Sequence, residues 1–180
     1  FIKPNSEYWF GTDNLGRDYW CQVWYATQVS IRLALVVAVG ESIVGVIFGL
    51  IWGYVRKLDR FFTELYNICD NVPSTIILIL ISYVASPSVQ TLILGMSITG
   101  WIAMARFIRN QILIIRDRDY NVASRCIGTP IRRIVLRNLL PYLVSVIMLR
   151  MALTIPAAIG SEVFITYIGL GLSVETPSLG

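Results

Sequence analysis

Long apolar stretches, separated by short polar or basic segments, dominate the pattern of this chain. A helix needs about 20 apolar residues to cross a bilayer, and four stretches match or approach that length. We expect membrane spans at about 30–54, 62–85, 89–108 and 139–159. A soluble helical protein would keep a polar face on each helix, and several of these stretches have almost none. The pattern therefore predicts an all-α, polytopic transmembrane helical bundle.

Two of the stretches are irregular. The second is densest in apolar residues only over 72–85, so we expect its helix to begin near Phe61 or Phe62 and to turn Asp70 and Asn71 toward protein. The fourth contains Pro156 and Gly160, and proline removes a helical hydrogen bond. We expect this helix to kink or end there.

The composition agrees with lipid as the solvent and excludes several kinds of site. Hydrophobic residues make up 56% of the chain and charged residues 14%, whereas soluble domains carry about 25% charged residues. Histidine is absent, which excludes histidine zinc sites and Ser-His-Asp triads. Cys21, Cys69 and Cys126 are odd in number and far apart, which does not suit a disulfide framework or a metal site. We expect no catalytic, cofactor-binding or metal-binding residues.

The orientation follows from the basic residues, since cytoplasmic loops are enriched in Lys and Arg. Basic residues gather in 56–60 and in 109–137, and the turn at 86–88 has none. We expect the two basic loops to be cytoplasmic and the segments 1–24 and 161–180 to lie outside.

Small residues recur every four positions in the first stretch, at Gly45, Gly49 and Gly53. Small residues at this spacing let helix backbones approach closely in a membrane, although chance placement of glycine would give the same pattern. A second row on a neighbouring face consists of Ala34, Ala38 and Ser42.

Two charges fall near the middle of their spans, Glu41 in the first and Arg150 in the fourth. Intramembrane charges usually face the bundle interior or a water-filled path. Glu41 and Arg150 then either pair with each other or meet backbone and water separately. In a third interpretation, Arg150 lines a water-filled path through the bundle.

The basic segment 116–138 has the pattern of two short helices. Asp119 is placed to cap a helix over 120–127, and Gly128 suits the left-handed residue after a helix. Thr129 is placed to cap a second helix that starts at Pro130. A rigid helix–turn–helix on the cytoplasmic surface and a solvated basic loop held to lipid headgroups both fit this pattern.

The stretch 119–128, DYNVASRCIG, followed by Leu140 and Pro141, resembles the EAA loop of ABC importer permeases. Ala123 and Gly128 match the motif, as do Leu140 and Pro141. Val122 stands where the motif has glutamate, and Ser124 replaces its second alanine.

Other stretches are similar to the second permease subunit of dipeptide and oligopeptide importers. These are FGTDNLGRD at 10–18, Trp101, Ala105, Arg106, Arg109, Glu162 and IGLGL at 168–172. Glu64 and Asn67 depart from the family pattern, which has Arg and Asp there. The resemblance implies a type I ABC importer fold, with four of an expected six spans in this chain. Since the chain begins at Phe1, we interpret it as an excerpt of a longer protein.

The resemblance also implies a function: a permease subunit that moves peptides across the bacterial cytoplasmic membrane. An importer permease for nickel or another small solute is the alternative. The implied partners are a homologous second permease, two ATPase subunits that hold ATP and Mg, an extracellular binding protein and lipid, with no nucleic acid. The chain has no Gly-x-x-x-x-Gly-Lys-Ser/Thr motif for ATP, so we expect it not to be an enzyme. The residues expected to couple it to the ATPase are Asp119, Tyr120, Ala123, Ser124, Gly128, Arg132, Arg133, Leu140 and Pro141.

Two other classes of membrane protein fit less well. A membrane-embedded enzyme would need paired carboxylates or a Ser/Lys dyad at membrane depth, and only Glu41 and Arg150 lie there as isolated charges. A channel would show a selectivity-filter sequence, and the chain has none.

Overall fold

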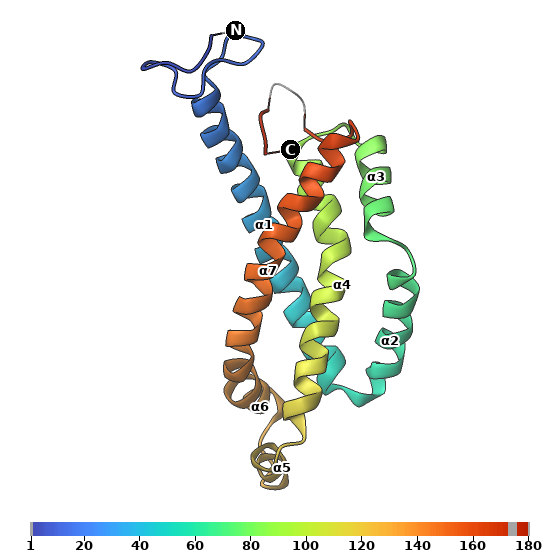
Figure 1. Ribbon diagram of the computed structural model, residues 1–180. Coiled ribbons are helices and arrows are strands. Elements are labelled where there is room, and N and C mark those ends of the chain that lie inside the picture. The colour runs from blue at the N-terminus through green and yellow to red at the C-terminus, as the bar shows by residue number, and fades with distance from the viewer. Residues whose placement is uncertain (1, 173–175, 180) are drawn as a thin grey trace.

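Three long helices form the body of the protein in the computed structural model, which describes residues 2–172 and 176–179. They are α1 (Tyr19–Tyr54), α4 (Val89–Arg116) and α7 (Leu140–Tyr167). Figure 1 shows them side by side, with α1 packed against both α4 and α7. Each is long and apolar enough to cross a membrane, so the chain is a multi-pass membrane protein.

All three long helices extend well beyond the predicted spans. α1 begins at Tyr19 because Asp18 caps it, accepting a 3.0 Å hydrogen bond from the backbone N–H of Trp20. Its 36 residues make a rod of about 54 Å, longer than the roughly 30 Å hydrocarbon core. α4 continues past residue 108, since Ile112 and Ile115 are both buried against the bundle.

The sequence predicts that the fourth helix kinks or ends at Pro156 and Gly160. α7 does not end there. The helix passes both residues and reaches Tyr167. Ile165 is fully buried, so the packing face continues beyond the proline, and membrane helices tolerate the lost hydrogen bond. The helix ends instead before Gly169, whose φ is +81°.

The second predicted stretch is not one helix. It forms α2 (Arg56–Asp70) and α3 (Ser74–Val84), which are bent by 68° relative to each other. Pro73 stands at the break, where it lacks an N–H and disfavours helical backbone at Val72. The pair forms a fourth candidate span only if the two helices are taken together.

The remaining helices lie at one end of the bundle. They are α5 (Asp119–Cys126), α6 (Ile131–Ile134) and a π-helix, η1 (Val135–Leu139), which leads directly into α7. Figure 1 shows α5 and the α1–α2 link at this end and both termini at the opposite end. The arrangement suits the predicted topology, although the side of the membrane remains a prediction. Within the two segments that we expect on the extracellular side, residues 1, 173–175 and 180 are not among the described residues.

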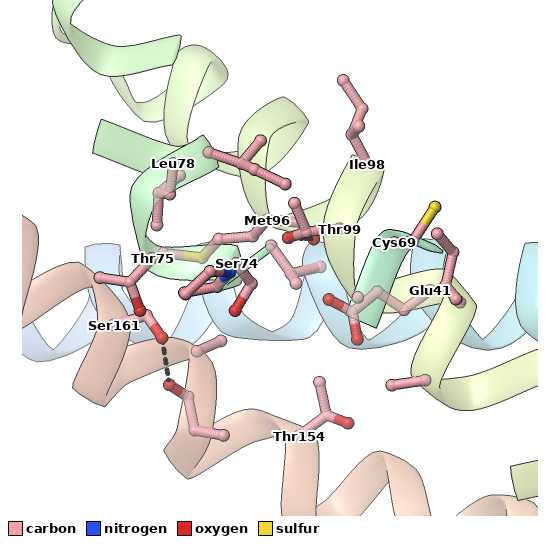
Figure 2. Close-up of a pocket in the computed structure, with 18 of the residues that line it drawn as sticks. Glu41, Cys69, Ser74, Thr75, Leu78, Met96, Ile98, Thr99, Thr154 and Ser161 are labelled. Carbon is pink, nitrogen blue, oxygen red and sulfur yellow. Dashed lines mark hydrogen bonds between the residues drawn. The ribbon is translucent and has the colours of Figure 1, made fainter. Parts of the chain in front are cut away.

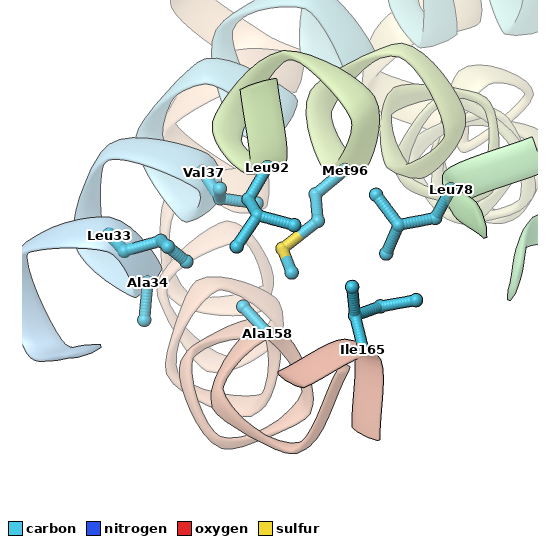
Figure 3. Packing of buried hydrophobic residues seen from close by; sticks show 8 residues of the cluster. All are labelled: Leu33, Ala34, Val37, Leu78, Leu92, Met96, Ala158 and Ile165. Carbon is cyan, nitrogen blue, oxygen red and sulfur yellow. The ribbon is translucent and has the colours of Figure 1, made fainter. Parts of the chain in front are cut away.

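The apolar core has two parts along α4. The part shown in Figure 3 joins all three long helices and α3: Leu33, Ala34, Val37, Leu78, Leu92, Met96, Ala158 and Ile165. The other lies toward α5: Met104, Ile108, Ile112, Ile115, Leu139 and Leu143. α4 therefore contributes to both parts of the core, and α1 packs along both of them.

The glycine row of α1 makes the predicted close helix contact, and its partner is α4. A Cβ atom on Gly49 would stand 2.7 Å from both the Ala105 carbonyl oxygen and the Ile108 Cβ. One on Gly53 would stand 2.9 Å from the Ile112 Cβ. These glycines let the two backbones approach to a distance that a larger residue would prevent.

Gly49→Ala is expected to destabilise the protein, although alanine is the better helix former by about 1 kcal/mol. The added methyl group has to push α1 and α4 apart, and overpacking costs typically about 1–3 kcal/mol. Gly160→Ala is the matched control, because a Cβ there meets nothing within 4 Å. Thermal unfolding in detergent checks the pair, and equal midpoints for the two variants would contradict the tight contact.

Candidate functional site

A surface helix, α5, is present in the predicted segment, but its ends are not capped as expected. Asp119 is its first residue, one position too late to cap it, and Arg118 at the cap position makes no side-chain cap hydrogen bond. Likewise Pro130, not Thr129, precedes the first residue of α6. Both predicted capping roles are therefore wrong.

Gly128 does take the predicted left-handed conformation, with φ of +78°. Its N–H donates to the Arg125 carbonyl at 3.0 Å, and the Thr129 N–H donates to the Ser124 carbonyl at 3.0 Å. This pair of bonds is the Schellman motif, which ends a helix at a glycine. The turn after α5 is thus defined by backbone bonds rather than left as a loose loop.

Large apolar side chains are exposed on this end of the molecule. Tyr120 is 51% and Ile127 is 83% exposed, and Ile131 and Leu136 follow them. Exposed apolar patches rimmed by polar residues mark interaction sites. Among the predicted coupling residues, Ser124 and Leu140 are half-buried, and the exposed ones are Asp119, Tyr120, Ala123, Gly128, Arg132, Arg133 and Pro141.

Asn121 is a residue that sequence reasoning missed. It is only 1% exposed, and its Nδ2 donates a 2.8 Å hydrogen bond to the Ile115 carbonyl in α4. Its Oδ1 accepts a 2.9 Å bond from Nδ2 of Asn138 in η1. One buried side chain thereby fastens α5 to both α4 and the start of α7. A polar residue within a basic loop gave no signal of this role.

Asp117 is a second connection, exposed and surrounded by arginines. Its carboxylate lies 3.2 Å from the guanidinium of Arg56, 3.2 Å from that of Arg116 and 3.1 Å from that of Arg125. The hydrogen bond from Arg125, helped by Arg116, holds the pKa of Asp117 below its usual value. The carboxylate therefore stays ionised at neutral pH and links the α1–α2 junction, the end of α4 and α5.

A cavity of about 1000 Å³ lies between α1, the α2–α3 break, α4 and α7. Glu41 and Arg150 both line it, as do the hydroxyl residues Ser74 and Thr99; Figure 2 shows Glu41, Ser74 and Thr99 around this space. Glu41 and Arg150 form no ion pair within 4.0 Å in the described part of the chain. The guanidinium of Arg150 lies instead 5.8 Å from the centre of the Phe107 ring.

One buried carboxylate joins α7 to α1 near the end of the bundle that carries the termini. Glu162 is fully buried and accepts hydrogen bonds from the hydroxyls of Ser30 at 3.3 Å and Thr166 at 3.0 Å. The Ser30 hydroxyl in turn accepts from the backbone N–H of Leu179 at 3.1 Å. This network holds the C-terminal segment against α1.

Comparison with known proteins gives one consistent result. The family profile described as "Binding-protein-dependent transport system inner membrane component" matches residues 45–180. The whole chain is 43% identical to the oligopeptide transport system permease protein AmiD of Streptococcus pneumoniae, covering 58% of that protein. It is 34% identical to the dipeptide transport system permease protein DppC of Bacillus subtilis, over 99% of this chain and 56% of that protein. It is 36% identical to the oligopeptide transport system permease protein OppC of the same organism, over 98% of this chain and 58% of that protein. The chain thus spans little more than half the length of these relatives.

Proposed function

Because the chain belongs to the family of binding-protein-dependent transport system inner membrane components, we propose that it forms part of a peptide importer's permease subunit. The names of its relatives refer to oligopeptide and dipeptide transport, which favours peptides over nickel as cargo. The importer would lie in the bacterial cytoplasmic membrane. Two ATPase subunits would hold ATP and Mg, a second permease would complete the path, and a binding protein would deliver peptide from outside.

The observation that carries the proposal is the end of the bundle formed by α5. Tyr120 and Ile127 are exposed there, while Asn121 and Asp117 fasten the same short helix to α4 and η1. An apolar surface on a firmly attached helix suits docking of an ATPase subunit. Motion of that subunit would then displace α4 and α7, because hydrogen bonds join α5 to α4 and to η1, which leads into α7.

Gly128→Val is expected to abolish most import by the reconstituted transporter while leaving it assembled. No atom lies within 4 Å of a Cβ on Gly128, so the effect comes from the backbone alone. A β-branched residue resists the left-handed conformation, and α5 would lose its defined end. Peptide import and ATP hydrolysis in proteoliposomes measure the result.

Gly128→Asn is the control, since asparagine tolerates the left-handed region. We expect this variant to retain most of the import. Normal import by the valine variant would contradict the coupling role of α5. Failure of the wild-type complex to hydrolyse ATP in response to peptide would contradict the peptide-importer proposal itself.

A further inference from the structure

The cavity between α1, α2–α3, α4 and α7 carries charges of both signs near the middle of the bundle. Glu41, Asp70 and Arg150 line it. In the described part of the chain, neither the Glu41 carboxylate nor the Arg150 guanidinium has a hydrogen bond or ion pair. The two charges act on each other at longer range, and intramembrane charges of this kind face the bundle interior or a water-filled cavity. Most side chains that line the cavity are apolar, and these charges, together with the hydroxyl groups of Ser74 and Thr99, form its polar part.

The break between α2 and α3 supports the same interpretation independently. Asp70, Val72, Pro73 and Ser74 come from the break and line the cavity, and Figure 1 places this break about halfway along the bundle. Non-helical backbone at membrane depth is tolerated only where it is buried in protein or lines a water-filled cavity. Water in this cavity would satisfy the backbone groups that the break exposes.

A residue of α4 lies beside each of the two charged side chains, Glu41 and Arg150. A Cβ on Gly100 would collide with the Glu41 carboxylate, so the absent side chain at this position makes room for Glu41. Arg150 lies near the face of Phe107, an arrangement that attracts a cation. α4 thereby keeps the two opposite charges on the walls of the cavity without an ion pair between them.

We propose that this cavity is a section of the transport path that receives the charged ends of a peptide. Arg150 would meet the carboxylate, and Glu41 would meet the ammonium group. The cavity volume of about 1000 Å³ reaches the upper end of the roughly 300–1,000 Å³ range of small-molecule sites. The proposal rests on the proposed function, since it requires a zwitterionic cargo.

The native Cys69 lines the cavity and gives a direct test of water access. In the full-length subunit, assembled with its partners, Cys21 and Cys126 are replaced by serine. Thiols react as thiolates, and a charged thiolate forms where water reaches the side chain. If the cavity holds water, a water-soluble methanethiosulfonate reagent is therefore expected to label Cys69. A pentapeptide with free termini, shown beforehand to be imported by the wild-type complex, is expected to slow this labelling during ATP turnover.

A complex that retains only Cys21, which is exposed before the apolar part of α1, is the control and should label without protection by the peptide. Cys69 that never reacts would mean that lipid or protein fills the cavity. Cys69 that reacts at the same rate with and without the peptide would mean that the cargo does not enter it. Either result overturns the proposal.

The charges are tested by blocking the ends of the peptide. Arg150→Gln is expected to lower import of the free peptide about tenfold, which is about 1.4 kcal/mol, and import of its C-terminal amide much less. Glu41→Gln is expected to show the reciprocal preference with the N-acetylated peptide. The binding protein is the same in every complex, so a changed ratio between peptides belongs to the permease.

Two further variants serve as controls for this test. Arg150→Lys keeps the charge and is expected to restore import of the free peptide. Arg32→Gln removes an exposed charge from α1 outside the cavity and should leave the ratios unchanged. Equal loss for free and blocked peptides would overturn the charge assignment. Import of no peptide at all by the wild-type complex would instead reject the proposed function.

Discussion

Asn121→Ala is expected to leave the transporter hydrolysing ATP but importing little peptide. The substitution removes the donor to the Ile115 carbonyl and the acceptor for Asn138. The Ile115 carbonyl keeps a bond from the Arg118 N–H, and Asn138 keeps a 3.5 Å hydrogen bond to the Ser124 hydroxyl. The substitution therefore removes two hydrogen bonds, each worth about 0.5–1.5 kcal/mol. α5 would then move with the proposed ATPase subunit without carrying α4 and η1 with it. Import per ATP hydrolysed in proteoliposomes is the measurement.

A double-mutant cycle shows whether the Asn121–Asn138 bond is responsible. Residues in one hydrogen-bond network couple by about 0.5–3 kcal/mol, so the double alanine variant should lose less than the sum of the two single losses. Asn67→Ala on α2 is the control, because Asn67 is exposed and its side chain makes no hydrogen bond in the described part of the chain. Additive losses, or tight coupling retained in Asn121→Ala, would refute this role.

Asp59→Asn is expected to give the second large effect, a loss of stability at the start of α2. Both carboxylate oxygens of Asp59 accept bonds from Arg109, at 2.8 Å from Nε and 3.0 Å from Nη2. The Trp52 indole N–H donates to the Asp59 carbonyl at 3.2 Å, so α1, α2 and α4 meet at this point. The side chains are 35% and 21% exposed, so the loss should fall below the roughly 3–5 kcal/mol of a fully buried pair. The midpoint of thermal unfolding measures the loss.

Reversing the pair separates charge from shape. The double variant Asp59→Arg with Arg109→Asp is expected to recover part of the stability that each single reversal loses. Lys57→Gln, on the same helix, exposed and with no ion pair in the described part of the chain, should change the midpoint little. Equal stability for Asp59→Asn and Lys57→Gln would show that the bridge is not a stabilising contact.

Several features could be predicted from the sequence because each depends on residues close together in the chain. The apolar stretches predict the helices α1, α4 and α7, since their composition alone favours lipid. The spacing of Gly45, Gly49 and Gly53 predicts a close helix contact, since a four-residue repeat places them on one face. The end of α5 at Gly128 could be predicted because it depends on the left-handed backbone angle of that one residue.

The tertiary structure decided what depends on partners far apart in the chain. Asn121 and Asn138 meet because η1 turns back beside α5, and Asp59 meets Arg109 fifty residues away. The depth of Glu41 and Arg150 in their spans left their pairing open, because depth does not fix the rotation of one helix relative to another. Packing of α1 against both α4 and α7 fixed that rotation and placed the two charges in one cavity without an ion pair. The direction of the chain at Pro73 was likewise decided by how α3 packs, since a proline predicts a break but not the angle that follows it.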